Sequence, residues 1–251
     1  MLKKPLALSV ALVLATVSLG LPVHSAHAAT AESPKAMNPF FQISPLPFQY
    51  PQFDKITDAD YAPAFKRGMA DQTAEIKAIA DNPAAPTFDN TILAMERSGQ
   101  ILNRAALVFF NQTSANTNDT LDKIDVEFSP KFAAHSDSIY LNDKLFARIK
   151  TLYNDRANLG LDAQSVRLVE RYYTDFVRAG SNLTEAQKTR IKAINAEMAT
   201  LTTQFSQNVL AEVNDSAIIV TDRAELAGLT DEQIAILAES AKEKGMPGKY
   251  R

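Results

Sequence analysis

Hydrophobic residues recur every three or four positions through most of the chain, which is the period of an amphipathic helix. The first such stretch begins with Thr57 or Asp58 as its cap, since both residue types cap helices, and ends near Pro83. Its apolar positions are Tyr61, Phe65, Met69, Ile76 and Ile79. Thr87 then caps a second predicted helix, which runs without a break over residues 88–110.

The same period predicts further helices along the rest of the chain. They cover residues 121–133, with a kink at Pro130, and then residues 138–153, 163–179, 184–215 and 231–244. Asp162 caps the helix that Gly180 closes, and Thr184 opens the longest helix, of about 30 residues or roughly 45 Å. The apolar stripe of this longest helix consists of Ile191, Ile194, Met198, Leu201, Phe205, Val209 and Val213.

Two stretches depart from this helical pattern. Residues 217–221, AIIVT, are short and β-branched and predict a single strand near the C-terminus. Residues 29–56 carry four prolines between Pro39 and Pro51, which exclude a regular helix there. The aromatic residues of this stretch favour an extended arm lying over a folded body. The fold class predicted is all-α, an antiparallel helical array joined by short loops, with a helical domain over residues 57–251.

The first 28 residues have the composition of a secretory signal. Lys3 and Lys4 precede an apolar run that begins at Leu6, and Ala26 and Ala28 supply the small residues of a cleavage site. A membrane anchor is the alternative, but the apolar run is short for a span of roughly 20 residues. We therefore expect cleavage after Ala28, a periplasmic location, and no membrane attachment after cleavage.

Charge and cysteine content exclude several classes of function. Without Lys3 and Lys4 the chain has 24 basic and 29 acidic residues, a formal charge of −5, and no basic stripe is visible. Nucleic-acid binding is therefore not expected, because an acidic chain repels phosphate backbones. The chain has no cysteine, which excludes disulfides, thiolate zinc sites and cysteine nucleophiles.

The residues that could hold a catalytic zinc are scarce. A catalytic zinc site usually takes three protein ligands, often including two histidines, and H-E-x-x-H is the common helical arrangement. The chain has no such motif, and His24 and His27 leave with the predicted signal, so that His135 remains alone. His135, Ser136 and Asp137 carry the letters of a serine triad, but triad residues converge from separate elements. We expect a solvated or helix-capping His135, no catalytic residue, and no metal or cofactor bound by this chain.

Two other groups of residues have a structural and a functional interpretation. Tyr172, Tyr173 and Phe176 can pack in the core with a hydroxyl reaching a partner, or a tyrosine can face a substrate. The charges of Glu170–Arg171 and of residues 185–188 are typical of solvated helix faces.

Three long stretches resemble the N-terminal portion of bacterial peptidyl-dipeptidases (Dcp), in order and at the same spacing. The stretches are NPFFQISPLPFQYPQFDKITDADYAPAF, PTFDNTILAMERSGQIL and VERYYTDFVRAGSNLTEAQKTRIKAINAEMATLTTQFSQNVLAE. These enzymes are zinc metallopeptidases of the family that includes oligopeptidase A and thimet oligopeptidase. The resemblance covers nearly all of residues 38–250, and none of the matched pieces is a catalytic motif.

The resemblance implies a large helical enzyme with a deep channel, which releases C-terminal dipeptides from oligopeptides. The zinc ligands of such an enzyme lie downstream of the matched portion, so the chain resembles an N-terminal fragment that ends at Arg251, before the catalytic zinc domain. We expect this chain alone to be an inactive monomer. The alternatives are a non-enzymatic periplasmic helical peptide-binding protein and a helical structural module without a ligand.

Overall fold

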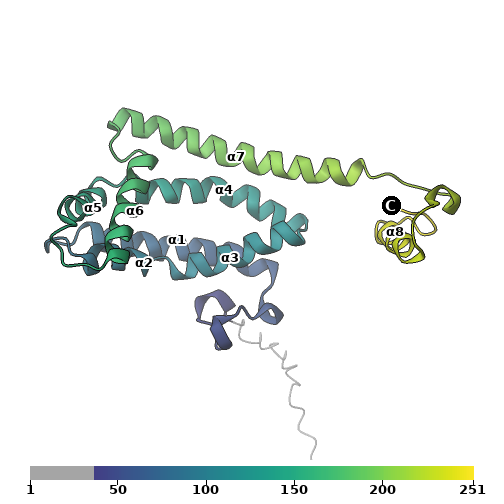
Figure 1. Cartoon of the computed structure of the whole chain (residues 1–251), viewed down its shortest axis with the longest axis horizontal. Coiled ribbons are helices and arrows are strands. Elements are labelled where there is room, and N and C mark those ends of the chain that lie inside the picture. Colours follow the sequence, from purple (N-terminus) through teal and green to yellow (C-terminus); the bar gives the residue numbers. More distant parts are fainter. Residues whose placement is uncertain (1–36) are drawn as a thin grey trace, which may run out of the picture. The chain divides into compact units, whose positions relative to one another are not determined.

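The computed structural model describes residues 37–251, and these residues are almost wholly helical (Figure 1). The predicted signal peptide and the first part of the predicted arm lie outside the described residues. The all-α class and the antiparallel arrangement are confirmed. Within residues 37–251, none of the helices combines the length and the apolar character that crossing a membrane requires.

Helix α1 (Asp58–Ala80) is the central element, and it packs against α3 (Gln100–Ala115) and α4 (Asp119–Tyr140). Of the two predicted caps, Thr57 is the one that caps α1, in a capping box with Asp60, and Asp58 is the first residue of the helix. Helices α1 and α3 approach closely at Gly68, where an added Cβ would lie 2.6 Å from the backbone nitrogen of Leu102. Glycine at this position therefore permits the contact between the two helices.

The N-terminal half of α1 lies in an aromatic cluster with α3 and α4. Phe65 is fully buried, and its ring centroid lies 5.2 Å from that of Phe109 and 4.8 Å from that of Phe132. A second hydrophobic cluster joins the C-terminal half of α1 to α5 (Asp143–Asp155) and α6 (Ala163–Ala179), which contact each other. Rings stack across this pair, with Tyr153 and Tyr173 centroids 3.8 Å apart.

The single helix predicted over residues 88–110 is wrong. The chain forms a π-helical segment (Phe88–Leu93), a short α2 (Ala94–Glu96) and then α3. The break is at Gly99, which has φ of 70° and whose N–H donates to Glu75 Oε2 at 2.8 Å. An added Cβ at Gly99 would meet the Gln72 side chain at 2.4 Å, so only glycine suits this turn.

The boundary predicted at Ser138 is also wrong. Helix α4 continues through Pro130 to Tyr140, and α5 begins at Asp143. Asn142 separates the two helices because its side-chain oxygen accepts a hydrogen bond from the N–H of Leu145, at 3.0 Å, and so caps α5. The predicted ends of α6 are confirmed, with Asp162 as its N-cap and Gly180 at φ of 109° as its left-handed C-cap.

The longest helix is α7 (Glu185–Asp215), which Thr184 caps as predicted. It is followed by α8 (Asp231–Glu243), capped by Thr230. The strand predicted over residues 217–221 is reduced to one antiparallel bridge, in which Val220 and Tyr250 exchange two backbone hydrogen bonds of 2.9 Å.

The described part of the predicted arm forms short 3₁₀ turns at Pro39–Phe41, Pro47–Gln49 and Phe53–Lys55. Phe40 is buried and its ring lies 5.3 Å from that of Tyr61. In contrast, the side chains of Phe48, Tyr50 and Phe53 are exposed. The expectation that the aromatic residues of the arm lie over the folded body therefore fails for these three.

Candidate functional site

His135 is neither solvated nor a helix cap. It lies within α4, half-buried, and its Nε2 is 2.7 Å from Oε1 of Gln72 on α1. Burial lowers the pKa of the His135 imidazole, because the protonated ring would lose its hydration. The sequence did not predict this contact, since Gln72 lies 63 residues away along the chain.

The neighbours of His135 do not form a triad with it. Asp137 is buried and accepts a hydrogen bond from Asn195 Nδ2 at 2.7 Å, whereas Ser136 is exposed. Each of the three residues therefore has a different environment, and none of the relayed contacts of a serine hydrolase is present among them.

The described residues do not fit a zinc site. No group of three or more His, Cys, Asp or Glu side chains within residues 37–251 comes close enough to hold a metal ion. His135 is the one imidazole in the described residues. It is hydrogen-bonded to the side-chain amide of Gln72 and, within residues 37–251, to no carboxylate. No catalytic step is therefore assigned to these residues.

The aromatic residues of α6 pack in the core, as the structural interpretation predicted. Phe176 is fully buried, and the Tyr172 hydroxyl donates to Glu96 Oε1 at 2.7 Å. Burial, followed by this hydrogen bond and the charge of Glu96, raises the pKa of Tyr172 above its ordinary value. Tyr173 stacks on Tyr153. The hydroxyl of Tyr172 is thus occupied by a partner within the fold, which argues against a role in binding substrate.

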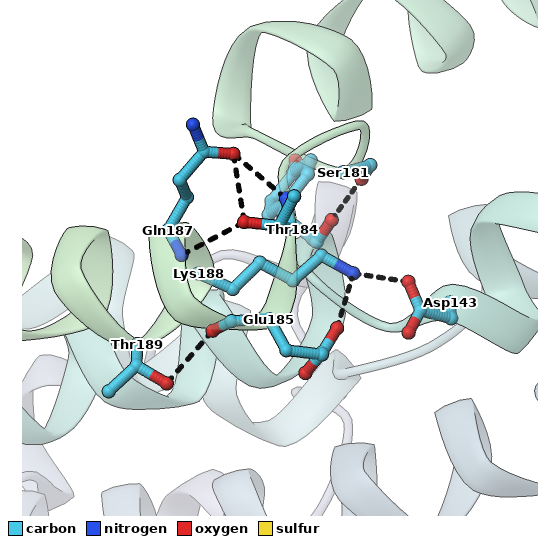
Figure 2. Close-up of polar contacts among 8 residues, drawn as sticks. Asp143, Ser181, Thr184, Glu185, Gln187, Lys188 and Thr189 are labelled. Carbon is cyan, nitrogen blue, oxygen red and sulfur yellow. Dashed lines mark hydrogen bonds and ion pairs between the residues drawn. The ribbon is translucent and has the colours of Figure 1, made fainter.

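Lys188 contradicts the interpretation of residues 185–188 as a solvated charged face. Only 4% of its side chain is exposed, and its amine forms ion pairs with Asp143 at the start of α5 and, at 3.2 Å, with Glu185 (Figure 2). These hydrogen bonds, that of Asp143 first, raise the pKa of the lysine amine. The nearby Ser181 hydroxyl donates to the backbone oxygen of Tyr140 at 2.5 Å. The first turn of α7 is therefore fixed by polar contacts to the junction of α4 and α5.

A groove of about 450 Å³ lies beside this junction. Its apolar lining includes Ile76 of α1 and Ile139 of α4, and its charged side chains are already paired. Asp81 binds both Lys77, at 2.5 Å, and Lys144, at 2.6 Å, and these two hydrogen bonds lower the pKa of its carboxyl to about 2. Because the ion pairs occupy these charges, the groove offers little to recognise a charged ligand.

Helix α7 contacts α4 through small and polar side chains and runs antiparallel to it (Figure 1). In addition to the bond between Asn195 and Asp137, Thr203 Oγ1 donates to Ser129 Oγ at 2.8 Å, and Gln207 Nε2 donates to the Asp122 backbone oxygen at 3.1 Å. This contact is a polar seam rather than a hydrophobic one.

The apolar residues of α7 point away from that seam. We define the apolar face of α7 as Ile194, Met198, Leu201, Phe205, Val209 and Val213, all of which are exposed. The largest of them, Phe205, is 69% exposed. The sequence identified this stripe. An apolar stripe on a helix normally indicates a buried face, but here the stripe is exposed. An unbroken apolar face of this length is typical of an interaction surface.

Comparison with known proteins identifies what the chain is similar to. No protein-family model matches it. It is 48% identical over 214 residues to dipeptidyl carboxypeptidase of Escherichia coli (strain K12) and 46% identical over 213 residues to that of Salmonella typhimurium. Oligopeptidase A of Haemophilus influenzae is 26% identical over 214 residues.

The matches cover most of this chain and a minor part of each relative. They include 85% of this chain, but only 31% of the two dipeptidyl carboxypeptidases and 30% of the oligopeptidase A. The chain thus spans about a third of the length of the relatives it matches. The resemblance predicted from the sequence is confirmed: the chain is homologous to the dipeptidyl carboxypeptidases and, more distantly, to oligopeptidase A, over about a third of their length.

Proposed function

We propose that residues 37–251 form a helical, non-catalytic part of a zinc-dependent peptidyl-dipeptidase that hydrolyses short oligopeptides. The observation that carries the proposal is the 48% identity to a dipeptidyl carboxypeptidase over 85% of this chain. In a complete enzyme of this kind, the zinc would be held by residues of the two thirds that the match leaves out. There it would polarise the scissile carbonyl and activate water.

The role proposed for the described residues follows from their architecture. Two hydrophobic clusters, one on each half of α1, hold this helical body together, and the side chains of His135 and Tyr172 are hydrogen-bonded to partners within the fold. Such a body can serve as one wall of a channel that admits unstructured peptides and excludes folded ones. It would contribute the shape of the channel wall, while the catalytic groups would belong to the rest of the longer protein.

We expect this chain to bind no stoichiometric zinc and to cleave no peptide by itself. The physical reason is the shortage of donors: the described part has one imidazole, already hydrogen-bonded, and no metal-binding cluster. The measurement is calorimetric titration with zinc, together with an assay of a short peptide with and without chelator. Peptide cleavage abolished by the chelator would overturn the proposal. Peptide binding without cleavage would instead favour the non-enzymatic alternative.

We also propose that the protein is exported to the periplasm by residues 1–28. The charged start, the apolar run and the Ala26 and Ala28 pair support this. Expression of the full chain in a Gram-negative host should give a periplasmic protein whose N-terminal residue is Ala29. Replacing Ala26 and Ala28 by leucine should block cleavage, since the peptidase requires small residues there. A product that keeps Met1 and remains in the cytoplasm contradicts the proposal.

A further inference from the structure

The apolar face of α7 is a feature of the described residues that the fold itself leaves exposed. Its six residues follow one another at spacings of three and four, so they share one side of the helix. Met198 is 58% exposed, Leu201 54% and Val213 67%. Scattered exposed apolar residues are ordinary on protein surfaces, but a continuous stripe along a long helix marks a contact.

The way α7 is attached to the rest of the fold strengthens this interpretation. Its inner side meets α4 through hydrogen bonds of Asn195, Thr203 and Gln207, and its first turn is held by the ion pairs of Lys188. Among the residues of α7, only Lys188 is buried. The hydrophobic free energy that α7 can contribute therefore remains almost entirely on its outer side, where a partner would gain from it.

We infer that the apolar face of α7 is the surface that packs against the remaining two thirds of a dipeptidyl carboxypeptidase chain. The inference rests on the proposed function. The inference is supported by the length of the relatives. About 70% of the residues of the E. coli and H. influenzae relatives lie outside the match to this chain. An apolar occupant is required, because an ionised group placed against this face would be desolvated without a partner. A second copy of this chain is the competing occupant.

The test uses a chimera in which the matching third of E. coli dipeptidyl carboxypeptidase is replaced by the matching residues of this chain. The double variant Leu201→Glu and Phe205→Glu should lower peptidase activity at least roughly tenfold, because two carboxylates would be buried in the contact. The control is Gln204→Glu, which adds a carboxylate at an exposed position between the two and off the apolar face. It should leave activity unchanged.

The outcomes separate the two proposals. An active chimera that the double variant does not impair overturns the inference and leaves the proposed function standing. A folded but inactive unsubstituted chimera overturns the proposed function itself. If the chimera does not fold, this chain is co-expressed with the rest of the relative as a separate polypeptide. The inference is supported if this chain captures the other polypeptide, if Phe205→Glu abolishes the capture and if Gln204→Glu retains it. If this chain captures nothing, the inference is overturned.

Self-association is measured on the full chain by sedimentation. A dimer that Phe205→Glu converts to a monomer would identify a second copy as the occupant and would overturn the inference. A monomer in both proteins is the expected result.

Discussion

Replacing Phe65 by alanine is expected to lower the free energy of unfolding by about 3 to 5 kcal/mol, the usual range for a large aromatic side chain removed from a packed core. The ring of Phe65 is fully buried and lies within 4.8 to 6.2 Å, between centroids, of four other aromatic rings. These rings come from α1, α3 and α4, so the cavity would open where the three helices meet.

Thermal unfolding measured by circular dichroism gives this value, with an expected fall in Tm on the order of 10 °C. The matched control is Leu107→Ala on α3, because Leu107 is 66% exposed and should change stability by less than about 0.5 kcal/mol. Equal effects of the two substitutions would mean that the aromatic cluster is not the core of the described unit.

Replacing Arg148 by methionine is expected to destabilise the protein by about 2 to 4 kcal/mol, through the loss of hydrogen bonds to a charged donor. Arg148 is buried on α5, and its guanidinium donates to the backbone oxygens of Asn82 and Ala84 at 2.8 and 3.0 Å. It also donates to Asn90 Oδ1 at 2.8 Å and to Thr91 Oγ1 at 3.3 Å. One side chain thus holds the whole connection from α1 to the π-helical segment.

The control for Arg148 is Arg171→Met on α6, which removes the same charge from a side chain that is 75% exposed and pairs with Asp175 at 3.5 Å. A surface pair of this kind contributes about 0 to 1 kcal/mol. Urea unfolding of the two variants should separate them clearly. Equal urea midpoints for the two variants would show that water replaces the guanidinium at the backbone oxygens of Asn82 and Ala84. Arg148 would then not hold the segment between α1 and the π-helical segment in place.

Local signals along the chain predicted most of the helices. Thr57, Thr184 and Thr230 cap the helices that follow them, and Gly180 ends α6, because capping depends on residues within one turn of the helix end. The breaks at Gly99 and Asn142 were missed because the apolar period continues across them. Gly99 could have been suspected, since a glycine inside a helical pattern can mark a left-handed turn.

Contacts between distant residues could not be predicted in this way. Lys188 was placed on a solvated face because its partner Asp143 lies 45 residues earlier in the chain. His135 and Gln72 are 63 residues apart, and nothing near either residue signals the other. Helical periodicity likewise identified the stripe of α7 but carries no information on whether the partner of that stripe belongs to the same chain.

The apolar face of α7 can be examined by thiol labelling, since the chain has no cysteine and each engineered cysteine is its sole thiol. Phe205→Cys in this chain should label rapidly, as should Gln204→Cys. In the chimera with the E. coli relative, followed by peptide mass spectrometry, Cys at position 205 should label at least roughly tenfold more slowly and Cys at position 204 should stay fast, because packed positions exclude the reagent. Equal rates at position 205 in the isolated chain and the folded chimera would contradict a role of α7 in joining this helical part to the rest of the enzyme.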